Sequence, residues 1–229
     1  MNFLYLWVNL FSVLVPFAFS FHPKLLFFRQ WKSALPAIAI CALLFILWDI
    51  YFTKLGIWGF SPSYITGIFI FNLPLEEVLF FVCIPYCCLF TYHCLKILIE
   101  KDHFHKYQDH ITLFLLIFLL YFGIMNTSKL YTSFTFFGLS LALVFIRYLY
   151  KPEWLSRFYF VYIVLLIPFF IVNGILTGTG LDHPVVWYNN LENLKIRILT
   201  IPFEDFFYGM LLILLNVFVY EHLNRKNAA

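Results

Sequence analysis

The chain has 229 residues, of which 63% are hydrophobic and only 12% are charged, and its formal net charge is +3. A soluble domain carries about 25% charged residues, so this composition disfavours a soluble helical protein and predicts an integral membrane protein. The small net charge gives no support for a nucleic-acid partner.

Long apolar runs predict seven transmembrane helices, because a stretch of about 18 or more apolar residues can cross a bilayer. The predicted spans cover residues 2–21, 34–53, 74–98, 110–127, 131–149, 157–173 and 202–220. The first run has no basic flank before it and no evident small-residue cleavage site. We therefore expect a retained span and not a cleaved signal peptide. The predicted fold class is an all-α integral membrane protein.

The basic residues predict the orientation of these spans, because cytoplasmic loops are enriched in Lys and Arg. With the N-terminus outside, eleven of the fifteen Lys and Arg residues fall on cytoplasmic segments and four on outer segments. We therefore expect the N-terminus outside, the C-terminus in the cytoplasm, and a multi-pass protein of the cell membrane.

An acidic motif occurs twice, as LPLEEVLFF at 73–81 and as IPFEDFFYG at 201–209. Residues upstream of the motif are also matched. The matched pairs are Pro74 with Pro202, Glu76 with Glu204, Glu77 with Asp205, Asp49 with Asn173, and Trp58 with Trp187. The first three spans thus correspond to the last three, and four spans separate the copies, so both copies cross in the same direction. We expect a first repeat at 1–100, a linker with the fourth span at 101–130, and a second repeat at 131–229.

The start of a helix could by itself explain one such motif. Proline is favoured in the first turn, acids there gain about 0.3–1 kcal/mol from the helix dipole, and Asn72 or Thr200 could cap the helix. However, the second acid is not needed for capping, each pair leads directly into an apolar run, and the pair recurs. Acids inside membrane spans are candidates for function. The predicted catalytic residues are Glu76, Glu77, Glu204 and Asp205, with Glu77 or Glu204 as the first choice of proton donor.

The aromatic content of 23% is the second clue to function. Membrane packing and interfacial belts account for most aromatic residues, but aromatic faces also attract cations. A proton donor surrounded by aromatic rings suits carbocation chemistry on an oily substrate. The predicted cation-shielding residues are Phe80, Phe81, Phe206 and Tyr208, and the predicted substrate-binding or orienting residues are Asp49, Asn173, Trp58 and Trp187.

Motifs for cofactors and metals are not found in the sequence. There is no G-x-G-x-x-G segment, no P-loop, no HExxH and no aspartate-rich diphosphate site. We therefore expect no bound cofactor and no metal.

The duplicated P-x-E-[E/D] motif, its Asp49/Asn173 and Trp58/Trp187 partners and the seven-span layout resemble the fused form of the heterodimeric-type lycopene cyclases, from about residue 3 to 220. The resemblance implies a flavin-independent enzyme that closes β-ionone rings on lycopene, with lycopene and the lipid bilayer as partners. The sequence does not determine the oligomeric state. The second copy departs from the first at Asn173 and Asp205. The halves are therefore unequal, and which of them holds the proton donor stays open.

The sequence leaves other arrangements and functions open. The two copies could form one composite cavity between spans two, three, six and seven, or two separate sites. The protein could cyclise another polyprenoid. A proton-coupled transporter or receptor is also compatible with paired acids, although no charged side chain follows in span three between Glu77 and Lys96, or in span seven between Asp205 and Glu221.

Overall fold

The structure is a computed structural model that describes residues 3–99, 101–102 and 104–228. Seven α-helices account for most of these residues. They are α1 (Leu4–Phe19), α2 (Trp31–Lys54), α3 (Leu75–Leu98), α4 (Gln108–Met125), α5 (Leu130–Val144), α6 (Leu155–Leu176) and α7 (Phe203–Ala228). A π-helical segment, Phe145–Tyr150, continues α5, and short 3-10 turns lie at Phe27–Gln30, Pro62–Tyr64 and His105–Tyr107.

Six helical segments of the described chain are long and apolar enough to cross a membrane. They are Phe27–Lys54, Leu75–Leu98, His105–Met125, Leu130–Tyr150, Leu155–Leu176 and Phe203–Lys226. The exception is α1, which is apolar but has only 16 residues. At 1.5 Å per residue it is about 24 Å long, short of a hydrocarbon core of about 30 Å. The predicted start of the first span, Asn2, lies outside the described residues.

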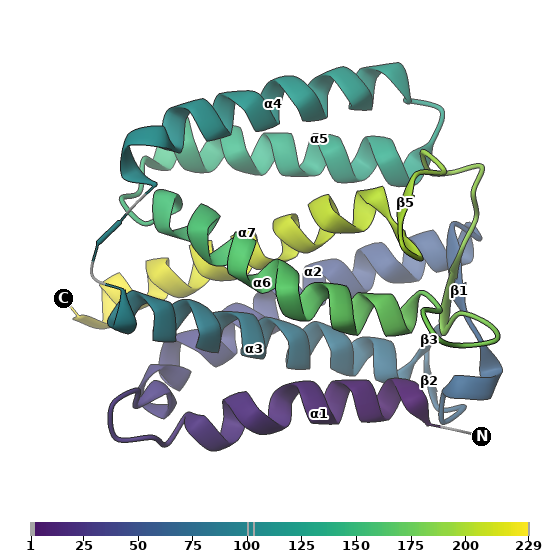
Figure 1. Cartoon of the computed structure of the whole chain (residues 1–229), viewed down its shortest axis with the longest axis horizontal. Coiled ribbons are helices and arrows are strands. Elements are labelled where there is room, and N and C mark those ends of the chain that lie inside the picture. The colour runs from purple at the N-terminus through teal and green to yellow at the C-terminus, as the bar shows by residue number, and fades with distance from the viewer. Residues whose placement is uncertain (1–2, 100, 103, 229) are drawn as a thin grey trace.

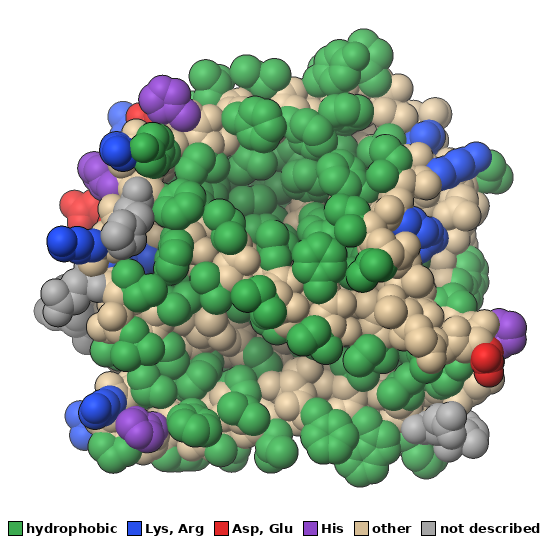
Figure 2. All heavy atoms as spheres, in the orientation of Figure 1, with side chains coloured by type: hydrophobic (Ala, Val, Ile, Leu, Met, Phe, Trp, Pro, Cys, Tyr) green, Lys and Arg blue, Asp and Glu red, His purple; other side chains and the backbone are tan. Residues whose placement is uncertain are grey.

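The helices lie lengthwise in one bundle, with all the strands at one end and the C-terminus at the other (Figure 1). α1 packs against α3, α4 packs against α5, and α2 and α7 pack together between these pairs. Hydrophobic side chains cover the middle of the face shown in Figure 2, and charged side chains gather near the two ends of the helices. This is the distribution that a bilayer around the bundle requires.

A cap of short strands covers the end of the bundle where the acidic motifs lie. Strand β1 (Trp58–Phe60) pairs antiparallel with β4 (Val186–Tyr188), which joins the loops of the two halves. Two hairpins, β2–β3 (Phe69–Ile70 with Leu73–Pro74) and β5–β6 (Arg197–Ile198 with Ile201–Pro202), lead directly into α3 and α7. The two halves therefore build the same hairpin before the same helix.

The turns of these two hairpins confirm that their backbones match. Phe71 has φ 57° and Leu199 has φ 58°, the left-handed conformation that a bulky residue adopts at a cost. The two residues lie 128 positions apart, the same offset as the acidic motifs. Each hairpin thus turns in the same way to deliver its proline and its acids to the start of a helix.

Helices α3 and α7, which carry the acids, are also tied together at their opposite ends. The Lys96 Nζ atom lies 2.6 Å from Glu221 Oε1, and the Tyr92 hydroxyl donates to the same oxygen at 2.8 Å. Glu221 is buried, and a buried carboxylate needs such partners. This contact fixes the distance between the two helices at the end away from the cap.

Candidate active site

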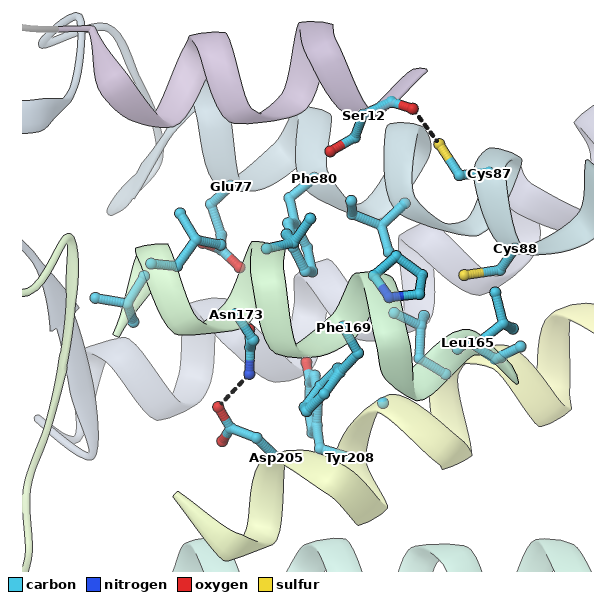
Figure 3. Close-up of a pocket in the computed structure, with 18 of the residues that line it drawn as sticks. Ser12, Glu77, Phe80, Cys87, Cys88, Leu165, Phe169, Asn173, Asp205 and Tyr208 are labelled. Atoms are coloured by element: carbon cyan, nitrogen blue, oxygen red, sulfur yellow. Dashed lines mark hydrogen bonds between the residues drawn. The ribbon is translucent and has the colours of Figure 1, made fainter. Parts of the chain in front are cut away.

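A cavity of about 330 Å³ lies inside the bundle beneath the cap. Its walls come from α1, α2, α3, α5, α6 and α7 and from strands β1 and β4. Glu77 of the first acidic pair and Asp205 of the second line this same cavity, close enough for their charges to interact. The two halves therefore meet in one composite cavity, to which α1 and α5 contribute in addition to the four helices considered from the sequence (Figure 3).

The first acid of each pair is turned away from the cavity and accepts a hydrogen bond from the loop that precedes its helix. Glu76 Oε1 accepts the backbone N–H of Thr66 at 2.6 Å, and Glu204 Oε1 accepts the backbone N–H of Leu194 at 2.7 Å. Both donors lie ten residues before their acid. Thr132 Oγ1 also donates to Glu204 Oε1, at 2.6 Å. Glu76 and Glu204 are fully buried and do not line the cavity, so the structure gives them an anchoring position.

The second acid of the first pair, Glu77, accepts one hydrogen bond on the cavity wall. The Tyr5 hydroxyl donates to Glu77 Oε2 at 2.5 Å. Asp49 lies close enough for its charge to interact with Glu77. Among the described residues, Asp49 Oδ2 is buried without a hydrogen-bond partner. Two buried carboxyl groups this close resist joint ionisation.

The second acid of the other pair, Asp205, accepts three hydrogen bonds. Tyr131 donates at 2.5 Å, Asn173 Nδ2 at 2.7 Å and the Tyr188 hydroxyl at 2.9 Å (Figure 3 shows the Asn173 bond). Burial, and next the Asp205 carboxylate, raises the pKa of the loop residue Tyr188 well above its ordinary value, so this phenol stays a donor. Three donors favour the carboxylate form of Asp205.

Aromatic rings form much of the wall between the two acids. The Tyr208 ring lies edge-on to Trp48 and Trp58, at centroid distances of 5.4 and 6.2 Å. Phe80 packs edge-on against Tyr5 at 6.2 Å. The cavity therefore offers π-faces beside both carboxyl groups, which suits a positively charged intermediate.

The structure separates the residues predicted from the sequence into two groups. Seven of them line the cavity, namely Asp49, Trp58, Glu77, Phe80, Asn173, Asp205 and Tyr208. Five do not, namely Glu76, Phe81, Trp187, Glu204 and Phe206. Phe81 packs instead against Phe45, and Phe206 against Phe169, at centroid distances of 6.0 and 4.9 Å.

Trp187 is not the counterpart of Trp58 in the cavity. In the β1–β4 ladder Trp58 faces Tyr188, whereas Trp187 faces Gly59. Trp187 is 44% exposed, and its indole ring covers Gly59 so closely that a Cβ there would lie 2.4 Å from it. Successive residues of a strand point to opposite faces. The sequence analysis matched Trp187 to Trp58 because each lies a similar number of residues before the proline of its motif. The residue that lines the cavity is instead the next one along the strand, Tyr188.

The expectation that Asn72 could cap α3 is wrong, because this helix has no side-chain cap at its N-terminus. The Asn72 side chain donates instead to the Ile50 carbonyl at 2.9 Å. In the other copy the Thr200 hydroxyl is hydrogen-bonded to the hydroxyls of Thr177 and Thr179. These polar residues fasten the hairpins to the preceding helices.

Three tyrosines that the sequence analysis missed complete the site, namely Tyr5, Tyr131 and Tyr188. Tyr5 and Tyr131 begin α1 and α5 and occupy equivalent places in the two repeats, each donating to the second acid of its pair. An alignment of the first and fifth spans could have found Tyr5 and Tyr131. Within the described residues, no group of three His, Cys, Asp or Glu side chains is arranged to hold a metal ion.

The family model described as lycopene cyclase matches residues 2–95 and 128–223 of the chain. These two segments are the two repeats, with the α4 region between them. Searches of curated proteins and of solved structures give no significant match.

The anchoring position of Glu204 predicts a stability difference between two variants. Glu204→Ala leaves the Leu194 N–H and the Thr132 hydroxyl without their acceptor, and each buried unpaired donor costs about 1–3 kcal/mol. Glu204→Gln keeps a carbonyl oxygen in place. We expect thermal unfolding in detergent several degrees lower for Glu204→Ala and near the unmodified protein for Glu204→Gln. Equal stability of the alanine variant would contradict the anchoring position.

Proposed function

Since the chain belongs to the lycopene cyclase family, whose members are carotenoid cyclases, we propose that it is a lycopene β-cyclase. It would close β-ionone rings on the ψ-ends of lycopene, giving first γ-carotene and then β-carotene. The observation that carries this proposal is the composite cavity in which Glu77 and Asp205, one from each repeat, lie among aromatic rings.

In the proposed reaction Glu77 is the general acid. Its proton is added to the terminal double bond of the ψ-end, which leaves a tertiary cation. The internal double bond attacks that cation, a carbon–carbon bond closes the ring, and the positive charge moves into the ring. Loss of a ring proton to Asp205 forms the β-ring double bond. The substrate gains one proton and loses one, so the step is an isomerisation that needs no electron donor or acceptor, and no redox cofactor is part of the proposal. Ring closure leaves the proton on Asp205, so Glu77 must take up a proton and Asp205 must release one before the next ring is closed.

The different surroundings of the two acids support these roles. Glu77 accepts one hydrogen bond and lies beside Asp49, so a protonated carboxyl group there avoids a second buried charge. Asp205 accepts three, which suits a carboxylate that waits for a proton. An alkene is a weak base, and the aromatic walls keep water away from the acid that must protonate it.

The aromatic residues of the wall would then shield the cation. Tyr208 and Phe80 lie on the turns after Asp205 and Glu77 and line the cavity with Trp58. A cation near an aromatic face gains about 0.5–1 kcal/mol when exposed and about 2 or more when desolvated. Phe81 and Phe206 are outside this proposal, because they do not line the cavity and pack instead against the rings of Phe45 and Phe169.

We extend the proposal to the arrangement of the chain in the cell membrane. Seven spans would place the N-terminus and both acidic motifs at the outer side and the C-terminus in the cytoplasm, as the basic residues indicate. The matched hairpins before α3 and α7 support two repeats at 1–100 and 131–229, with 101–130 as linker. Reporter fusions at the two termini test this orientation.

Expression in a lycopene-accumulating host tests the function most simply. We expect the red lycopene to be converted to carotenoids with one and two β-rings, which pigment chromatography separates from other ring types. The matched control is the Glu77→Gln variant in the same host. Unchanged lycopene beside correctly inserted unmodified protein would contradict the proposal, and a cyclised product made only from another polyprenoid would show a different substrate.

The assigned roles predict which acids are indispensable. Glu77→Gln removes the proton donor, and loss of a general acid lowers rates by about 10²–10⁴-fold. Asp205→Asn removes the proposed base and should lower the rate to a similar extent.

The neighbouring acid provides the control for this pair. Glu76→Gln keeps the oxygen that accepts the Thr66 N–H and should retain most of the activity. The measurement is the rate of ring formation per amount of inserted protein. Full activity of Glu77→Gln, or complete loss in Glu76→Gln at normal protein level, would overturn the assignment.

A further inference from the structure

The cavity is walled by buried residues on some helices and reaches the outer surface of the bundle on others. Most of its lining residues on α2, α5 and α7, such as Asp49, Tyr131 and Leu212, are buried, and none of them is exposed. On α6, by contrast, Pro168 and Ile171 line the cavity and are exposed, Ile171 by 61%. The described residues thus give the cavity an opening at α6.

The other side of this opening is α1. Ser12 and Pro16 of α1 line the cavity and are half-buried, as are Cys87 and Thr91 of α3 beneath them. α1 and α6 lie on either side of α3, and each packs against it (Figure 1). The cavity therefore opens sideways between α1 and α6, across the helix surface that faces the hydrocarbon of the bilayer.

The polar groups at this opening are already satisfied within the protein. Pro16 has no N–H, so it cannot donate to the Ser12 carbonyl as a helix residue normally does. The Cys87 thiol lies 3.2 Å from that carbonyl oxygen and 2.9 Å from the Cys83 carbonyl oxygen, so the two carbonyl groups share its one hydrogen (Figure 3 shows the contact with Ser12). The Ser12 hydroxyl donates to the Val8 carbonyl at 2.7 Å, and the Thr91 hydroxyl to the Cys87 carbonyl at 2.9 Å. The passage thus presents an apolar surface to a hydrocarbon chain.

The size of the cavity indicates what occupies the passage. A forty-carbon polyene is about as long as the hydrocarbon core of a bilayer is thick, about 30 Å. A cavity of about 330 Å³ is at the small end of ligand pockets and holds one end of such a chain. The rest of the chain must leave the cavity through an apolar opening while the end group lies between Glu77 and Asp205.

We propose that the passage between α1 and α6 is the lateral entrance for the polyene, and that the unreacted part of the chain lies in it during ring closure. This inference rests on the proposed function and adds the path that the substrate takes. It follows that the two ends of lycopene enter one after the other, and that the monocyclic product withdraws through the same passage before its second end can react.

Large side chains placed in the passage test this proposal. Ile171→Trp and Ser12→Trp narrow it from α6 and from α1. Their matched controls are Ile167→Trp and Leu14→Trp, which are 68% and 58% exposed on the same helices and do not line the cavity. Rates of lycopene consumption are measured per amount of inserted protein, in vesicles that contain lycopene.

We expect the two passage variants to be slowed about tenfold or more, because a side chain forced into a fitted passage must displace its occupant. The two controls should stay within about twofold of the unmodified protein. Ile171 is already exposed, so its tryptophan variant remains informative if Ser12→Trp fails to insert.

The failure of the entrance and the failure of the function are distinguishable. If Ile171→Trp consumes lycopene as fast as Ile167→Trp while the unmodified protein is active, the entrance lies elsewhere and the cyclase proposal stands. If the unmodified protein leaves lycopene unchanged, the proposed function fails and the entrance fails with it.

Discussion

A helix turns by about 100° at each residue, so two consecutive acids at the start of α3 or α7 cannot face the same point. The site depends on this constraint. The first acid of each pair, Glu76 or Glu204, points to the loop before its helix and accepts a backbone N–H from it. The second, Glu77 or Asp205, points into the cavity. One short motif therefore fastens the cap to the bundle and places a carboxyl group beneath that cap.

The duplication of this motif matters because its two copies have diverged. Each second acid accepts a hydroxyl from a tyrosine of the first helix of its own repeat, Tyr5 or Tyr131. Beyond that shared contact, Asp49 stands beside Glu77, whereas Asn173 donates to Asp205. A carboxyl neighbour disfavours a second negative charge, and an amide donor supports one. A symmetric pair of acids is thus converted into an unequal pair suited to give and to receive a proton.

Much of this arrangement could be predicted from the sequence because it rests on local patterns. Hydropathy located each of the seven α-helices of the described residues, six of them long enough to cross a membrane, and the repeat pointed to Asp49 and Asn173. Contacts set by the loops could not be predicted in this way. The pairing of β1 with β4 decides that Tyr188 and not Trp187 faces the cavity, and this register is fixed by contacts between segments about 130 residues apart. The same limit applies to Phe81 and Phe206. They lie within about one helical turn of the acids along the sequence but pack against other aromatic rings. The length of α1 also differs from the expectation, because its helix ends at Phe19.

The central claim is that Glu77 carries a proton and Asp205 does not before the substrate arrives. Infrared spectroscopy of the purified protein in lipid measures this directly, because a protonated carboxyl group has a C=O stretching band separate from the bands of a carboxylate. The account predicts that one such band disappears in Glu77→Gln and persists in Asp205→Asn. A band that persists in Glu77→Gln and disappears in Asp205→Asn would contradict it.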